Sequence, residues 1–151
     1  MFIKAYHGST AAVIVVRRIN LILQTERIEE PEDGSMQKFA LLLGILEPLV
    51  INEENANNAI KEGVISALGK VLLLEDRFFQ GMNKAENIFQ CASQILKLSL
   101  RSLVSCVRQR EAAKLFMDDF SLFNALVELL RRTGEVEIIA NGLKTVRFIL
   151  A

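Results

Sequence analysis

Apolar residues recur along most of the chain at the spacing of an amphipathic helix, which is three, four or seven positions. The stripe in 85–107 consists of Ile88, Ala92, Ile95, Leu96, Leu103 and Val107. The stripe in 135–150 consists of Val136, Ile139, Ala140, Leu143, Val146 and Leu150. Leu98 and Leu100 lie off the first stripe, so we expect that helix to be covered on more than one side. No segment shows sustained alternation with turn dipeptides, and the pattern therefore predicts an all-α fold.

Helix breakers divide the chain into short, medium and long helices. Gly8–Ser9–Thr10 precedes the first helix, an acidic linker with Pro31 follows it, and Ser35 and Asn52 are suitable N-cap residues for the next helices. Gly63 marks a tight corner between two helices, where glycine tolerates a positive φ. The predicted helices cover 11–24, 35–50, 52–62, 64–74, 85–105, 107–117, 119–131 and 135–151.

The order of short, medium and long helix occurs twice, in 52–105 and in 107–151, and 1–50 holds an incomplete set. A repeat period of about 50 residues marks a stacked helical array, in which each unit needs its neighbours to cover its apolar faces. We therefore expect one domain over 1–151, as part of a longer solenoid. The hydrophobic content of 51% agrees, because it indicates apolar surface that packs on more of the same chain or on a partner.

Residues 52–68 read Asn-Glu-Glu-Asn-Ala-Asn-Asn-Ala-Ile-Lys-Glu-Gly-Val-Ile-Ser-Ala-Leu, which resembles the junction between the first and second helices of an armadillo repeat. The family's third helix ends on Leu-x-Asn-Leu, and the segments 46–50 and 100–104 are similar to it. The resemblance covers 35–151 and implies an α-α superhelix of stacked armadillo or HEAT-like three-helix repeats. The second junction, 110–126, lacks the glycine, so HEAT-type helical pairs remain an alternative there.

The resemblance also implies that the long third helices line a concave groove that binds an extended peptide. In the nuclear-import receptors of the family, this groove carries ladders of tryptophan and asparagine. This chain has no Trp, and Pro48 and Ser102 stand at the asparagine positions. A nuclear-signal receptor of that type is therefore disfavoured.

Candidate partner-binding residues lie on the predicted third helices and in one loop. The third helices carry Gln94, Lys97, Arg101, Lys144 and Arg147 at spacings that place them on shared faces. A basic stripe of this kind could hold an acidic segment of a partner, although solvated residues on an exposed face are the alternative. Phe78 and Phe79 interrupt an otherwise polar loop, where they either fold back on the core or anchor a partner.

Residues suited to catalysis or metal binding are sparse. His7 is the only histidine, so we expect neither a catalytic triad nor a zinc site. Cys91 and Cys106 would lie about 22 Å apart on one helix, which is too far for a disulfide. Arg108 and Arg110 could contact phosphate but lack interleaved aromatic residues. Lys and Arg balance Asp and Glu at 18 each, which disfavours a general nucleic-acid binder. No apolar run reaches the ~18 residues of a membrane span.

Together these features predict a non-catalytic scaffold or adaptor that binds a partner protein or peptide on an armadillo-like concave surface, without a cofactor. Buried free thiols suit a reducing compartment, which favours the cytoplasm, with the nucleus as a second option. The alternative function is an oligomeric structural element of a cytoskeletal or ciliary assembly. The last helix ends at Ala151 without a polar cap, which would allow self-association through the ends of the array.

Overall fold

The computed structural model describes residues 2–25, 34–74 and 86–151, and the side chains of 10–25, 34–74 and 90–151 within them. This part of the chain forms eight α-helices and no strand, so the all-α class that the apolar spacing predicts is confirmed for it. In chain order the helices are α1 Phe2–Thr25, α2 Ser35–Leu49, α3 Glu53–Lys61, α4 Val64–Leu73, α6 Glu86–Val107, α7 Arg110–Asp118, α8 Phe120–Arg132 and α9 Val136–Leu150.

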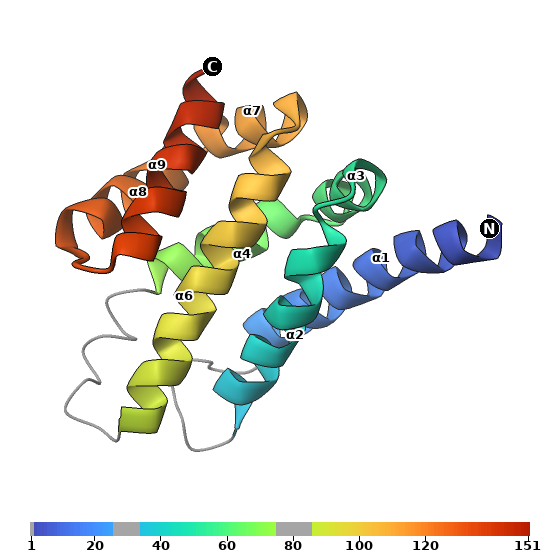
Figure 1. Cartoon of the computed structure of the whole chain (residues 1–151), viewed down its shortest axis with the longest axis horizontal. Helices are drawn as coiled ribbons and strands as arrows, with labels where there is room; N and C mark the ends of the chain where they lie inside the picture. The colour runs from blue at the N-terminus through green and yellow to red at the C-terminus, as the bar shows by residue number, and fades with distance from the viewer. Residues whose placement is uncertain (1, 26–33, 75–85) are drawn as a thin grey trace.

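The longer helices lie in two layers (Figure 1). In one layer α2, α6 and α9 lie side by side and run in the same direction, with α6 in contact with both neighbours (Figure 1). In the other layer α1, α4 and α8 cross behind them, where α1 contacts α2, α4 contacts α6 and α8 contacts α9. The short helix α3 packs on α1, α4 and α6, and the short helix α7 packs on α6, α8 and α9. The order of the elements in space therefore follows their order in the sequence.

Two predicted helix starts are wrong. The first helix does not begin after Gly8–Ser9–Thr10, because α1 starts at Phe2 and runs through these residues. A glycine inside a helix costs only about 1 kcal/mol relative to alanine, which weakens a helix without ending it. Ser35 is not the N-cap of α2: Gly34, with φ +78°, takes that place, and Ser35 is a buried residue of the first turn.

Helix α6 lies at the centre of the core. Ile95, Leu96 and Leu100 are fully buried on it, and Leu98, from outside the main apolar stripe, is only 7% exposed. The prediction that this helix is covered on more than one side is therefore confirmed. Burial of each such side chain contributes about 1.5–3 kcal/mol. Three serines of α6 are buried as well, and their small side chains leave room for the neighbouring helices: Ser93, Ser99 and Ser102.

Two glycines bring α8 close to its neighbours. A Cβ atom added to Gly69 of α4 would overlap the side chain of Leu122, which belongs to α8. A Cβ atom added to Gly142 of α9 would lie 2.5 Å from the Cδ2 atom of Leu130, also on α8. Because side chains in a packed interior leave few voids, a larger residue at either glycine would force the side chain of Leu122 or Leu130 to shift.

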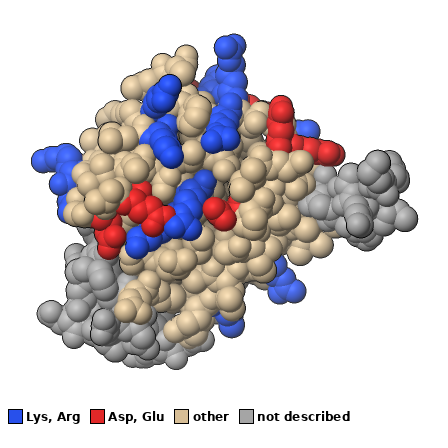
Figure 2. All heavy atoms as spheres, in the orientation of Figure 1, with Lys and Arg blue, Asp and Glu red and all other residues tan. Residues whose placement is uncertain are grey.

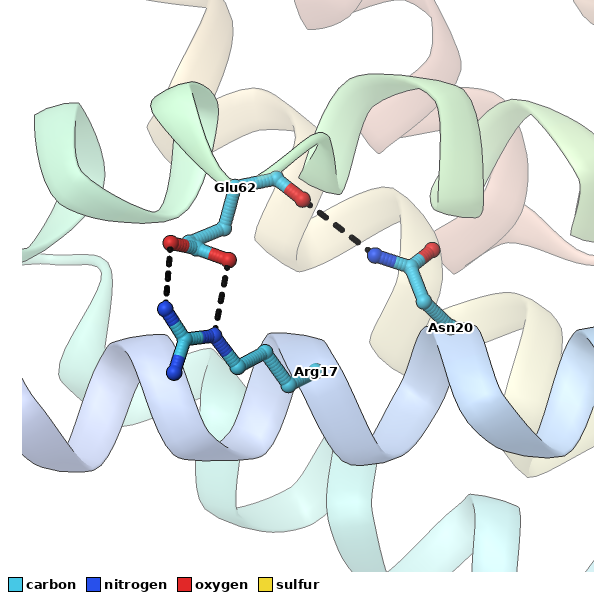
Figure 3. A network of polar contacts seen from close by, with 3 residues as sticks. All are labelled: Arg17, Asn20 and Glu62. Carbon is cyan, nitrogen blue, oxygen red and sulfur yellow. Dashed lines mark hydrogen bonds and ion pairs between the residues drawn. The ribbon is translucent and has the colours of Figure 1, made fainter.

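The corner between α3 and α4 connects α1 to the helices that follow (Figure 3). The Arg17 guanidinium of α1 binds the Glu62 carboxylate through Nε at 3.1 Å and a terminal nitrogen at 3.2 Å. The Asn20 side chain donates to the backbone oxygen of Glu62 at 3.2 Å, so one residue of the corner is held through both its side chain and its backbone (Figure 3). Arg17 is largely exposed, so the ion pair fixes geometry more than it adds stability.

Residues at the two ends of α3 behave as the sequence predicts. The Asn52 side chain accepts a hydrogen bond from the backbone N–H of Asn55 at 3.1 Å, and it thereby caps the helix. Gly63 has φ +90°, which lies in the left-handed region, so the expected positive φ at this corner is confirmed.

Substitution of Gly63 by alanine should destabilise the fold. At φ +90° an alanine side chain is strained, and the cost is about 1–3 kcal/mol. The free energy of unfolding, measured by urea titration followed by circular dichroism, should fall by that amount. The matched control is Gly134→Ala, because Gly134 has an ordinary φ and open space around its Cβ position. An equal loss in both variants would contradict the strain at the corner.

Candidate functional site

The exposed side of α2, α6 and α9 forms one broad surface, which we call the helical wall. Along α6 the wall carries Gln94, which is exposed, and Lys97 and Arg101, which are partly exposed. Along α9 it carries the exposed residues Lys144 and Arg147. The structure therefore places all five third-helix residues that the sequence selects on one layer of helices.

Two basic residues of α6 form ion pairs with acidic residues at the start of α9, its neighbour in the wall. Lys97 Nζ lies 3.5 Å from a carboxylate oxygen of Glu135, and Arg101 pairs with the carboxylate of Glu137. Glu135 is the N-cap residue of α9 and Glu137 lies in its first turn, where the helix dipole favours acidic groups. These pairs join α6 to α9, and they partly neutralise the middle of the predicted basic stripe.

The basic residues further along the wall have no such counterions. Within the described part of the chain, Lys144 and Arg147 form no ion pair. Phe148 lies one turn after Lys144 on α9. The centre of its ring is 5.6 Å from the guanidinium carbon of Arg108, which follows α6. Figure 2 shows Lys and Arg side chains gathered at the top of the view, where α6, α7 and the C-terminal end of α9 lie.

We call Arg108, Arg110 and Lys114, which lie beside the ends of α6 and α9, the basic end of the wall. In the sequence Arg108 and Arg110 are isolated residues without neighbouring aromatic side chains, whereas the fold brings Phe148 beside Arg108 from 40 positions away. The available signal is the pair Arg110 and Lys114, which lie four residues apart on α7 and therefore on one face. Phe78 and Phe79 lie outside the described residues, so their predicted role as a partner anchor stays a prediction.

The two outer helices of the wall expose apolar side chains. On α2, Leu41 is 70% exposed and Ile45 is 51% exposed. On α9, Val136, Leu143 and Leu150 are exposed, although they belong to the apolar stripe that the sequence predicts for this helix. That prediction is wrong for these three residues, because α9 packs through another face, whose buried residues are Ile138, Gly142, Thr145 and Ile149. An open pocket of about 460 Å³ lies between α1 and α2, with Arg18, Leu21 and Leu41 among its lining residues. Exposed apolar residues that share a face are a feature of contact surfaces.

The titratable group with a lowered pKa, Asp119, has a structural role at the start of a helix. Asp119 accepts hydrogen bonds from the Ser121 hydroxyl at 2.5 Å and from the Ser121 N–H at 3.1 Å, and these bonds lower the pKa of its carboxyl group. Asp119 is thus the N-cap of α8. No three His, Cys, Asp or Glu side chains among those described gather as metal ligands would. None of the described helices combines the length and the apolar character needed to cross a membrane.

Searches of protein-family models, curated proteins and solved structures found no match to this chain. The interpretation of its function therefore depends on the geometry of the wall and its basic end.

The two cysteines should differ in reactivity. Both are free thiols; burial raises the pKa of Cys106 to about 12, and partial burial also raises the pKa of the less buried Cys91. Since the thiolate is the reactive form, a thiol reagent at pH 8 should modify Cys91 slowly and Cys106 only after unfolding. Absorbance measurements with a disulfide reagent, in buffer and in guanidinium chloride, check this. Cys91→Ser should remove the reaction seen in native buffer, and rapid native labelling of Cys106 would contradict the packing of α6.

Proposed function

We propose that this chain is a non-catalytic scaffold that binds another protein on the helical wall. In this proposal, α3–α4–α6 and α7–α8–α9 are two armadillo-like modules, and α1–α2 is an incomplete module before them. The side-by-side order of α2, α6 and α9, with α1, α4 and α8 behind, supports this assignment, because consecutive modules of a solenoid contact only their neighbours. The glycine corner at Gly63 supports it within the first complete module.

The wall is the observation that carries the proposal. Its three helices are held from behind, so their exposed residues present a firm surface that a partner can contact without much reordering of the chain. Its composition suits recognition of protein, since exposed leucine and isoleucine on α2 lie at one side and exposed basic residues on α9 at the other. We propose that the partner contributes an acidic segment. The free thiols Cys91 and Cys106 support a reducing location, such as the cytoplasm or nucleus.

Site-specific photo-crosslinking tests the wall as the binding surface. A benzophenone amino acid replaces Gln94 or Lys144 on the wall, or Lys70 on α4 as a control of similar exposure. If the proposal holds, wall positions should form adducts with one protein partner in cell extract, and Lys70 should not. Equal adducts from all three positions, or adducts from Lys70 alone, would contradict the assignment of the wall.

Self-association is the second candidate function, and a specific observation favours it. Both outer helices of the wall expose apolar side chains, with Leu41 on α2 and Val136 on α9 at 70% and 80% exposure. A copy of the chain could cover such edges and extend the row of helices, as the proposed structural element of a cytoskeletal or ciliary assembly would require. In the crosslinking experiment, adducts between two copies of the chain, in place of a second protein, select this function.

A further inference from the structure

An open pocket of about 410 Å³ lies where the end of α6, helix α7 and the end of α9 meet, which we call the basic-end pocket. Its lining combines two kinds of residue. The basic residues are Arg108, Arg110 and Lys114. The apolar residues include Met117, Phe148 and Ile149. A pocket with an apolar wall and a cationic rim can take an apolar side chain and hold negative charges beside it.

The charges of this pocket are unbalanced. Arg108, Arg110 and Lys114 are exposed, and in the described part of the chain none of them forms an ion pair, Glu111 of α7 included. Arg110 and Lys114 lie four residues apart on α7, where two like charges disfavour the helix. Lys144, four residues before Phe148 on α9, adds a further positive charge nearby.

The basic residues in the middle of the wall, unlike those of this pocket, have acidic partners. There the fold places Glu135 beside Lys97 and Glu137 beside Arg101. At the basic-end pocket it supplies no such counterion among the described residues, and Arg108 is instead positioned over the Phe148 ring. A guanidinium group that lies over an aromatic ring keeps the N–H donors at its own edge free for a carboxylate.

We propose that the basic-end pocket binds an acidic peptide segment that carries one large apolar side chain. The apolar side chain packs against Met117 and Phe148, and carboxylates on either side of it pair with Arg108, Arg110 and Lys114. This inference rests on the proposed scaffold function and names the part of a partner that the wall recognises. It also moves the acidic-segment hypothesis from Lys97 and Arg101, which already have acidic neighbours, to the end of the wall.

The lining favours peptide over nucleic acid. A groove for single-stranded nucleic acid needs several aromatic side chains that stack with successive bases, together with a strong excess of basic residues. This pocket has one aromatic side chain, and the chain as a whole has a formal net charge of zero. Met117 suits a peptide side chain, because methionine adapts to irregular apolar groups.

Fluorescence anisotropy with a defined probe tests the proposal. The probe is a labelled nine-residue peptide with one phenylalanine between two runs of four glutamates. It should bind the whole chain, and the double variant Arg108→Glu/Lys114→Glu should weaken binding by about tenfold, since each surface ion pair contributes up to about 1 kcal/mol. The matched control is Lys61→Glu/Lys70→Glu, which makes the same charge change at exposed positions on α3 and α4 and should alter binding less than about twofold.

A second probe and two comparison ligands isolate the apolar contact and the class of ligand. A peptide with serine in place of phenylalanine, and the variant Met117→Ser with the original peptide, should each bind more weakly than the parent pair. If both double variants weaken binding equally, the peptide binds through the overall charge of the chain and not at this pocket, which would overturn the proposal. Tighter binding of a ten-nucleotide oligothymidine than of the peptide would overturn it in favour of nucleic acid, and a phosphoserine peptide without glutamates that binds best would overturn the assignment to carboxylates.

The peptide-binding experiment and the crosslinking experiment can fail independently, so the pocket proposal and the scaffold proposal are tested separately. If the peptide fails to bind while Gln94 and Lys144 still crosslink to one partner, the wall remains the binding surface and only the pocket assignment fails. If the peptide binds while no wall position crosslinks to a protein, the pocket assignment stands and the wider wall does not.

Discussion

The burial of α6 between α2 and α9 is the contact on which the rest of the structure depends. Because α6 is covered on both flanks and from behind by α4, its leucines and isoleucines form the centre of the core. Three of its serines are buried as well. Once α6 is fixed, the directions of α2 and α9 are fixed as well, and the wall follows from the packing of its middle helix. The helices α2 and α9 stand at the two ends of this row, so each has one side that no further helix of the described chain covers. This explains the exposed apolar residues there.

The charges of the wall follow from the same row. The parallel course of α6 and α9 sets the acidic first turn of α9 beside the middle of α6, so that Glu135 and Glu137 meet Lys97 and Arg101. At its other end α9 carries Arg147 in its last turn, and this end lies beside Arg108, which follows α6, and beside Arg110 and Lys114 of α7. The ion pairs at one end and the uncompensated positive charge at the other thus follow from the acidic first turn and the basic last turn of α9, which lies along α6.

Much of the fold is predictable from the sequence, and less of the site is. Apolar spacing together with breakers and caps predicts the helices from α2 onward to within three residues. The breaker rule fails at Gly8, where a weak helix residue does not end the helix, and the capping rule fails at Ser35, where Gly34 takes the N-cap position. Helical spacing places the five candidate residues on α6 and α9, and their role in binding stays a prediction. The pairing of Lys97 with Glu135 and the stacking of Arg108 on Phe148 join distant segments. No local pattern encodes which charges a fold brings together.

Methyl–methyl contacts in solution test the central claim, which is that α6 lies between α2 and α9. Nuclear Overhauser effects are measured on the whole chain with labelled Ile, Leu and Val methyl groups. The account predicts contacts that join α2 to α6, through residues such as Leu43 and Leu46, and contacts that join Ile138 and Ile149 of α9 to α6. It predicts no network of contacts between α2 and α9. A dense α2–α9 network, or the absence of α6–α9 contacts, would contradict it.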